Sequence, residues 1–171
     1  MNRAIQTVVT LMVVWIVGSV IFELAEDDMP AGSQQRSVAS YVTAGGRPAS
    51  LEAFRGDYVW VDYAAEWCSY CEPQTRTIKA LEQRYGDKLV FLTVVTGTDQ
   101  VMQPPDAETA RAWADRFGLS HERVLARFST DTLPHHVLYS PTGEVIFRDS
   151  GLYDQDRILS ILRAKTPVLN R

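Results

Sequence analysis

The sequence has very little of two things that would point to particular functions, cysteine and clustered positive charge. Only two cysteines occur in 171 residues, at positions 68 and 71, and only three histidines, His121, His135 and His136. There is no Lys/Arg run, and the net charge is −4 with a pI near 5.4. A chain without a basic face lacks the electrostatic footprint that phosphate backbones require, so we expect no nucleic-acid partner. Internal repeats and low-complexity tracts are also absent from the sequence.

One long apolar stretch stands near the N-terminus. Residues 4–22, AIQTVVTLMVVWIVGSVIF, are 19 positions without a charge. As a helix they would span about 28 Å, close to the hydrocarbon thickness of a bilayer. Arg3 precedes the run and an acidic cluster follows it, which favours a cytoplasmic N-terminus with the remaining chain across the membrane. We therefore predict a membrane anchor in residues 1–24, a linker in 25–37 and a folded domain in 38–171.

Two other interpretations of the apolar stretch stay open. A cleaved signal peptide is one, because small residues stand at 31–33, although the run exceeds the usual length of about 7–15 residues. A buried core helix is the other, although the apolar residues share no single face.

The overall composition, 46% hydrophobic and 22% charged, is ordinary for a globular protein. A chain of this length has room for one domain with a substantial core and an appendage.

The rest of the chain alternates between strand-like and helix-like patterns. Strands are expected where β-branched and aromatic residues cluster, and helices where apolar residues recur every three or four positions. The expected strands are a short one at the start of the domain and segments 58–65, 88–96, 123–126, 134–139 and 144–149, and the expected helices are 69–85, 107–117 and 154–164. This order predicts an α/β fold in which a mixed central sheet carries helices on both faces.

The two cysteines stand three positions apart in WCSYC, and three uses are open. A structural disulfide there would close a four-residue loop and contribute roughly 2 kcal/mol, against about 4.7 kcal/mol for a 100-residue loop. A zinc site would need further ligands, and the consecutive His135 and His136 point to opposite faces of their strand, so at most one could join the cysteines. A copper-binding or assembly module that uses the pair and one histidine remains an alternative.

The position of the pair favours redox chemistry. Cys68 falls where strand 58–65 ends and helix 69–85 begins, and there free backbone N–H groups and the helix dipole stabilise a thiolate. Cys71, one turn on, lies on the same face within disulfide reach. Lowering a thiol pKa from about 8.5 to about 7 raises the thiolate fraction at pH 7 from about 3% to about half, which needs about 2 kcal/mol of differential stabilisation.

The segment VDYAAEWCSYCEP resembles the active-site segment of thioredoxins, in which a strand, Ala-Glu-Trp-Cys-x-x-Cys and a helix follow one another. Pro134, in TLPHHVLYSPTGEVIFRDSG, stands where that family has its cis-proline. The anchor and the long connection after strand 88–96 make the chain most similar to membrane-tethered TlpA/ResA-like thiol–disulfide oxidoreductases. The resemblance covers about residues 40–165. It implies a thioredoxin-like fold, disulfide exchange with protein partners, and no cofactor.

The resemblance also implies a role for each residue that matches the catalytic pattern. Cys68 would be the attacking thiolate and Cys71 the resolving thiol. Asp62, six positions before Cys68, would be the buried acid that assists proton transfer to and from the second cysteine. Its apolar neighbours do not decide which face it takes, so an acid facing solvent at the strand end stays the alternative. Pro134 would lie against the cysteine pair, with a trans proline opening an edge strand as its alternative.

A further set of residues is implied in partner binding: Trp67, Ser69, Tyr70, Leu133 and His135. Trp67 would shield the sulfurs and form part of the binding surface, with plain core packing as the alternative. Leu133 and His135 would offer backbone groups to an extended partner peptide, although His135 also fits an ordinary surface histidine. Ser69 and Tyr70 replace a dipeptide that contains proline in thioredoxins, and this leaves the redox direction open.

The combined prediction is a single-pass protein of the bacterial inner membrane whose periplasmic domain exchanges disulfides with partner proteins. Reduction of partner disulfides is the favoured direction, with an upstream membrane donor that re-reduces the cysteine pair. The alternative is a copper-binding or cytochrome assembly module that uses Cys68, Cys71 and a histidine.

Overall fold

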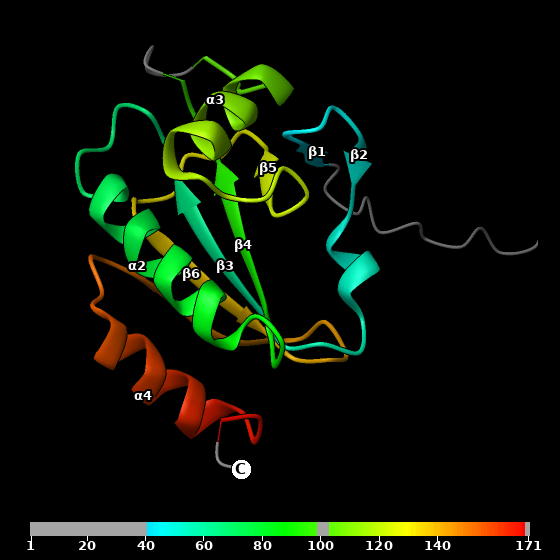
Figure 1. The fold of residues 1–171 in the computed structure, drawn as a ribbon, viewed down its shortest axis with the longest axis vertical. Coiled ribbons are helices and arrows are strands. Elements are labelled where there is room, and N and C mark those ends of the chain that lie inside the picture. The colour runs from blue at the N-terminus through cyan, green and yellow to red at the C-terminus, as the bar shows by residue number, and fades with distance from the viewer. Residues whose placement is uncertain (1–40, 99–102, 170–171) are drawn as a thin grey trace, which may run out of the picture. The chain divides into compact units, whose positions relative to one another are not determined.

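The computed structural model describes residues 41–98 and 103–169, so the predicted anchor and linker lie outside the described residues. The described chain forms one mixed sheet with α-helices packed against it (Figure 1). In chain order its elements are β1 (Tyr41–Thr43), β2 (Pro48–Ala49), the 3-10 helix η1 (Leu51–Phe54), β3 (Val59–Ala64), α2 (Cys71–Tyr85), β4 (Val90–Val95), α3 (Ala107–Phe117), β5 (Val124–Ala126), β6 (His135–Tyr139), β7 (Val145–Ser150) and α4 (Gln155–Lys165). Every strand and helix expected from the sequence of the domain is present.

The sheet has the strand order β2-β1-β5-β4-β3-β6-β7. Its centre is parallel, because β4 pairs in parallel with both β3 and β5. The hairpin β6–β7 adds antiparallel strands beside β3, and the hairpin β1–β2 adds them beside β5. Strands β3 and β4 are buried along their whole length, which fits their largely apolar sequences, and Asp62 is the one charged residue in either strand.

All three α-helices lie on one face of the sheet. Side chains alternate along β3, so that Trp60 and Ala64 face one side and Val61 faces the other. Residues of α2 and α4 pack with Trp60, and residues of α3 pack with Ala64, on the same side. Within the described ranges, the opposite face is covered in part by η1, whose Leu51 and Phe54 pack on it.

The prediction of helices on both faces is therefore wrong for the α-helices and holds only for η1. The reason lies in the strand order. The connections β3-α2-β4 and β4-α3-β5 both join parallel neighbours and step in the same direction across the sheet. Right-handed crossovers that step in the same direction place their helices on the same face.

Local signals in the sequence set the ends of α3. Asp106 caps its first turn by accepting a hydrogen bond from the Thr109 backbone N–H at 2.9 Å, and the two residues form a capping box. Gly118 ends the helix with a φ of +64°, in the left-handed region that glycine adopts at little cost. These two residues are the reason that the bounds of α3 were predicted correctly at both ends.

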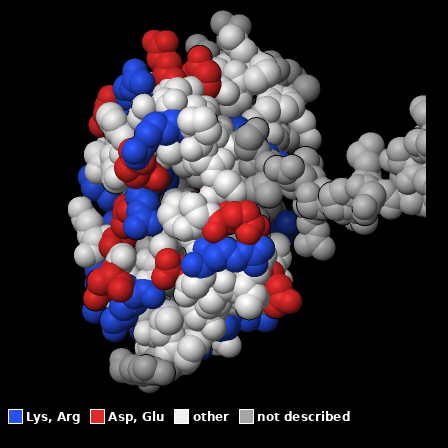
Figure 2. Space-filling view, turned by 90° about the vertical axis from the view of Figure 1, so that its right-hand side faces the viewer, with Lys and Arg blue, Asp and Glu red and all other residues white. Residues whose placement is uncertain are grey.

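Charges of both signs are interspersed over the surface that carries η1 and the β1–β2 hairpin (Figure 2). Two ion pairs there join neighbouring opposite charges, Arg47 with Glu122 and Arg55 with Glu52. That face therefore presents no single-sign field to a partner.

Across the described part of the chain, none of the helices combines the length and apolar character needed to span a bilayer.

Candidate active site

The two cysteines form a disulfide at the amino end of α2. The Sγ atoms of Cys68 and Cys71 are 2.12 Å apart, and the Cα atoms are 5.4 Å apart. Cys68 keeps 5% of its surface exposed, whereas Cys71 is completely buried. An incoming sulfur can therefore reach Cys68 but not Cys71, and this is the arrangement that the predicted attacking and resolving roles require.

Helix α2 begins at Cys71, two residues later than the predicted start at Ser69, so Cys68 precedes the helix by three positions. Cys68 lies in a turn that leads into the helix. Its backbone N–H donates to the Ala65 carbonyl at 3.0 Å, and its own carbonyl accepts from the Cys71 N–H at 3.0 Å. The N-cap residue, Tyr70, makes no side-chain cap bond, so no cap neutralises the positive end of the helix beside the two sulfurs.

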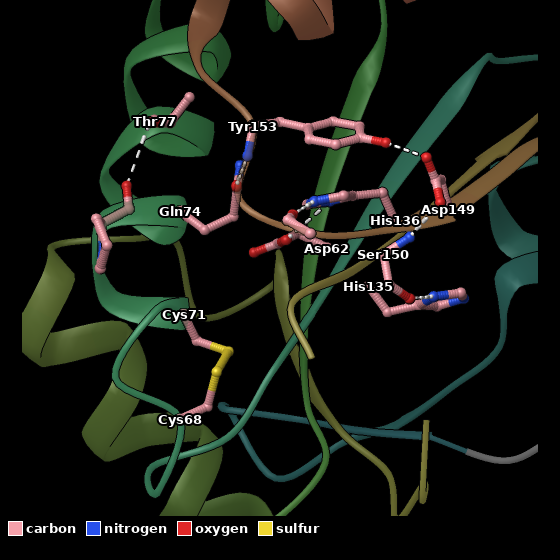
Figure 3. A network of polar contacts seen from close by, with 12 residues as sticks. Asp62, Cys68, Cys71, Gln74, Thr77, His135, His136, Asp149, Ser150 and Tyr153 are labelled. Atoms are coloured by element: carbon pink, nitrogen blue, oxygen red, sulfur yellow. Dashed lines mark hydrogen bonds and ion pairs between the residues drawn. A yellow bond between two sulfur atoms is a disulfide. The ribbon is translucent and has the colours of Figure 1, made fainter. Parts of the chain in front are cut away.

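Asp62 lies on β3, on the face that α2 covers, and its side chain is completely buried. The alternative of an acid facing solvent is therefore wrong. Burial raises the pKa of the Asp62 carboxyl above its ordinary value, because it penalises the charged form, and the neighbouring His136 opposes that rise. Figure 3 shows the Asp62 side chain between His136 and the part of α2 that carries Cys71 and Gln74.

His136 is a residue of the site that sequence reasoning missed. It lies directly opposite Asp62 in the antiparallel pairing of β3 with β6, and its side chain is also completely buried. Its Nδ1 atom is 3.1 Å from Asp62 Oδ1, and its Nε2 atom is 2.9 Å from the Gly151 carbonyl oxygen. The signal that could have found it is the alternation of His135 and His136, since one of the two had to share the face of Asp62.

The pKa of His136 is raised by its surroundings. Burial alone lowers it, but the close contact with Asp62 and the charge of Asp62 outweigh that effect, and the Gly151 carbonyl adds to the rise. Gly151 has a φ of +136°, which side-chain-bearing residues rarely adopt. A glycine at this position therefore lets the chain aim its carbonyl at the imidazole.

The segment after β7 is fastened to both sides of the site. The Gly151 N–H donates to the Pro134 carbonyl at 2.9 Å. The Tyr153 N–H donates to Gln74 Oε1 at 2.7 Å, and the Tyr153 ring stacks on His136 with 4.8 Å between ring centres. The side chain of Gln74 is completely buried on α2. These contacts fix the positions of α2, the proline and the histidine relative to one another.

Pro134 is buried, and the Leu133–Pro134 peptide bond is cis, as the resemblance implied. Leu133, half-buried, packs against the core cluster that contains both cysteines. His135 does not face that cluster. Its side chain lies on the other face of the sheet, where Nδ1 is 2.8 Å from the Ser150 hydroxyl and the ring contacts Tyr63. Burial lowers the pKa of His135, and it is only 9% exposed, so it is not an ordinary surface histidine.

Three residues of the WCSYC segment are open to solvent. Trp67 is 49% exposed and Tyr70 is 64% exposed, and Ser69 is exposed as well. Core packing is therefore the wrong interpretation of Trp67. Its indole lies close to Gly97, where an added Cβ would stand only 2.9 Å from the indole nitrogen. The exposed aromatic rings beside Cys68 are suited to contact a partner, and that role stays a prediction.

Within residues 41–98 and 103–169, no group of three or more His, Cys, Asp or Glu side chains is arranged to hold a metal ion. The histidine nitrogens close to the site have other neighbours, the Ser150 hydroxyl for His135 and the pair of Asp62 and Gly151 for His136.

A disulfide at a helix start, with one reachable sulfur and an ionisable group behind the other, defines a protein that exchanges disulfides. Comparison with known proteins agrees. The model of the thioredoxin-like domain family matches residues 53–166. The thioredoxin-like protein YneN of Bacillus subtilis is 23% identical over 121 residues, which are 71% of this chain and 68% of that protein.

Solved structures share the fold. The exposed lipoprotein thioredoxin Etrx1 of Streptococcus pneumoniae superposes with a TM-score of 0.57 at 20% identity, covering 73% of this chain and 97% of that one. A secreted disulfide oxidoreductase of Mycobacterium tuberculosis gives 0.56 at 13% identity, covering 77% and 99%. The chain belongs to the thioredoxin superfamily, as a thioredoxin-like thiol–disulfide oxidoreductase with the pair Cys68 and Cys71.

Proposed function

We propose that the protein is a membrane-anchored, extracytoplasmic member of the TlpA/ResA-like branch that reduces disulfides in partner proteins. The observation that carries the exchange activity is the unequal access to the two sulfurs, since Cys68 keeps 5% of its surface exposed and Cys71 is completely buried. The membrane attachment rests on the uncharged run 4–22 and on the charges at its two ends. Residues 4–24 enter the bilayer in this proposal, and the folded domain stands on the periplasmic side.

Two of the structural relatives support an extracytoplasmic location, because one is described as an exposed lipoprotein and another as a secreted protein. The reducing direction rests on the resemblance to the TlpA/ResA-like branch. In that direction an upstream membrane protein with a free dithiol would reduce the pair of Cys68 and Cys71 after each turnover.

The reaction proceeds by two thiol–disulfide exchanges. The Cys68 thiolate attacks a disulfide of the partner, a bond forms between Cys68 Sγ and the attacked sulfur, and the other partner sulfur leaves as a thiolate. Cys71 then loses its proton and attacks Cys68 Sγ, so that the Cys68–Cys71 bond forms and the second partner sulfur leaves. The partner gains two electrons and the pair loses two. The exposed Trp67, Ser69 and Tyr70, and the backbone beside Pro134, would hold the partner chain during both steps.

Trapping in cells tests this function. A Cys71→Ala variant cannot complete the second step, so partner proteins should accumulate on Cys68 as mixed disulfides, which mass spectrometry identifies after non-reducing separation. The control is Cys68→Ala, which should trap none. The absence of mixed disulfides above this control would remove the main support for exchange with proteins.

Two further measurements test the location and the direction. The full-length chain should stay with the membrane fraction in alkaline carbonate, and its domain should be digested when protease reaches only the periplasmic face. The reduction potential of the pair, measured in glutathione buffers, should lie nearer that of thioredoxin, about −270 mV, than that of DsbA, about −120 mV. A value near the second would assign the protein as an oxidant.

A further inference from the structure

The contacts of the His136 ring fix how many protons the buried pair holds. A carbonyl oxygen can only accept, so the Nε2 atom that faces Gly151 at 2.9 Å must carry a proton. The Nδ1 atom faces Asp62 Oδ1 at 3.1 Å. A lone pair on Nδ1 and a carboxylate oxygen repel one another, so a second proton lies between these two atoms. Whichever of them holds it, the pair of Asp62 and His136 has no net charge.

Burial stabilises this neutral state, which we call the one-proton state after the single proton between Asp62 Oδ1 and His136 Nδ1. Both side chains are completely buried, and in such surroundings an isolated ionised carboxylate or imidazolium is strongly penalised. Removing the shared proton would leave a net negative charge in the core, and adding another would leave a net positive charge. The pKa shifts of the two residues agree with this state, since burial raises the pKa of Asp62 and the contact with Asp62 raises that of His136.

Few charged groups face the pair from the surrounding elements. Asp149 stands opposite His136 in β7 and accepts a hydrogen bond from the Tyr153 hydroxyl. Tyr153 stacks on the imidazole, and Arg157 of α4 lies over the Tyr153 ring. On the remaining sides are the uncharged side chains of Trp60 and Gln74 and, opposite Asp62 in β4, Thr93. The neighbouring His135 points away and has Arg148 and Asp131 nearby.

The second carboxyl oxygen of Asp62 faces away from His136 and toward α2. Asp62 Oδ1, Asp62 Oδ2 and His136 Nδ1 are all buried without a well-aligned hydrogen bond within the described residues, and Oδ1 is the oxygen that lies 3.1 Å from Nδ1. Figure 3 shows one oxygen of Asp62 toward His136 and the other toward α2, the helix that begins at Cys71. The second oxygen is therefore placed to receive a proton from the direction of Cys71.

We propose that His136 is a positioning residue which keeps Asp62 able to accept the Cys71 proton at neutral pH, because the two buried side chains share a single proton. This inference deepens the proposed exchange reaction and rests on it. It gives His136 a role in addition to that of Asp62. The two side chains form a neutral acid–imidazole pair in which Asp62 Oδ2 accepts the proton.

The proton balance of the second exchange step follows. In the mixed disulfide, Cys71 Sγ–H transfers its proton to Asp62 Oδ2 while the sulfur attacks Cys68 Sγ. The bond between Cys68 and the partner sulfur breaks, and its electron pair leaves on the partner as a thiolate. During the transfer, the negative charge on Cys71 and the positive charge on the pair balance one another, so the core gains no net charge. The pair then releases the proton to the departing thiolate or to solvent and returns to its one-proton state.

Without the imidazole the acid fails as an acceptor at neutral pH. In a His136→Asn variant, the amide can fill the place of Nδ1 but cannot carry a positive charge. Burial would then raise the pKa of Asp62 with only the smaller effect of His135 against it, and Asp62 would be protonated until the pH exceeds that value. Each unit by which its pKa exceeds the assay pH costs about a factor of ten in the acceptor form.

The experiment measures the resolution step in the full-length chain, solubilised in detergent, between pH 6 and pH 9. A thiol-bearing probe, 2-nitro-5-thiobenzoate, is loaded on Cys68 as a mixed disulfide, and its release by Cys71 is followed by absorbance in a single turnover. The variants are His136→Asn, Asp62→Asn and the double variant. The matched control is His121→Asn, which removes an exposed histidine on the loop after α3.

The wild type and the control should release the probe at a rate that changes little between pH 6.5 and 8.5. His136→Asn should be slower by about tenfold or more at pH 7 and should approach the wild type by pH 9. The double variant should have the same profile as Asp62→Asn alone, because the histidine acts only through the acid. A His136→Asn rate equal to that of the wild type, or reduced by one factor at every pH, overturns the proposal.

A second readout does not depend on exchange or on the folding of a variant. Nitrogen-15 spectra of the oxidised wild-type chain should show His136 without a titration between pH 5.5 and 8.5. A midpoint near the value of a free imidazole, about 6.5, would show that the proton leaves the pair and would overturn the proposal. If the wild type releases no probe at any pH while His136 shows no titration, the proposed exchange function fails and the shared proton stands.

Discussion

The shared proton of Asp62 and His136 predicts how the stability of the protein depends on pH. Both residues have a folded-state pKa above the ordinary value, so the folded state holds a proton that the unfolded state releases. In the unfolded chain Asp62 is ionised above about pH 4 and His136 is neutral above about pH 6.5. Between pH 6.5 and the folded-state pKa of the pair, therefore, the folded pair holds one proton and the unfolded pair holds almost none.

The sign and the magnitude follow from this difference of one proton. A raised folded-state pKa contributes stability that is fully present below the unfolded value and is lost as pH rises toward the folded value. One proton gives a slope of about 1.4 kcal/mol per pH unit, so raising the pH from 7 to 8.5 should remove about 2 kcal/mol of unfolding free energy. That is a large share of the 5–15 kcal/mol typical of domains.

The perturbation that tests this reasoning is the double variant Asp62→Asn/His136→Asn, in which two amides replace the proton-sharing pair. Urea unfolding of the oxidised, full-length chain in non-ionic detergent, followed by circular dichroism at pH 6, 7, 8 and 9, gives the unfolding free energy at each pH. The double variant should lose the downward slope above pH 7, and the His121→Asn control should keep it. A wild-type slope as flat as that of the double variant refutes the shared proton.

Three further predictions concern the binding surface and the core. Gly97→Val should displace the Trp67 indole, because an added Cβ would stand 2.9 Å from the indole nitrogen. The variant should have a raised KM for a reducible protein substrate such as insulin and an unchanged far-UV spectrum. An unaltered KM would contradict a binding role for Trp67. Ile78→Ala should cost about 2–5 kcal/mol in urea unfolding, because Ile78 is 1% exposed between α2 and the sheet, whereas the exposed Val145→Ala should change stability by at most about 0.5 kcal/mol. Gly118→Ala should cost about 1 kcal/mol, because its φ of +64° is unfavourable for alanine, and a stability equal to that of the wild type would argue against the left-handed helix end.

Most secondary-structure elements of the domain could be predicted because their signals are local. The ends of α3 follow from a capping aspartate and a terminal glycine, and β4 follows from a continuous apolar run. The start of α2 was predicted two residues early, because the turn at Cys68 uses helix-like hydrogen bonds that the sequence pattern does not separate from the helix itself.

The placement of elements in layers was harder to predict than their identity. Alternation of strands and helices is compatible with helices on one face or on both. The choice depends on the direction in which successive strands are added to the sheet, and that direction is decided by contacts between elements distant in sequence.

The sequence by itself determined the chemistry of this protein. Two cysteines in WCSYC between a strand and a helix, with Asp62 before them and Pro134 after them, were enough to indicate disulfide exchange and the superfamily. These features are contiguous residues or match a known pattern, so they can be recognised without coordinates.

Only the tertiary structure decided which face Asp62 takes, which sulfur is reachable and which histidine serves the site. His136 meets Asp62 through the register of β3 against β6, and the Gly151 carbonyl meets His136 through a turn that follows β7. Register and turn geometry depend on the packing of the whole sheet, because a slip of one residue would have brought His135 to Asp62 in place of His136. The proton that the two side chains share is therefore a property of the fold and cannot be read from either residue alone.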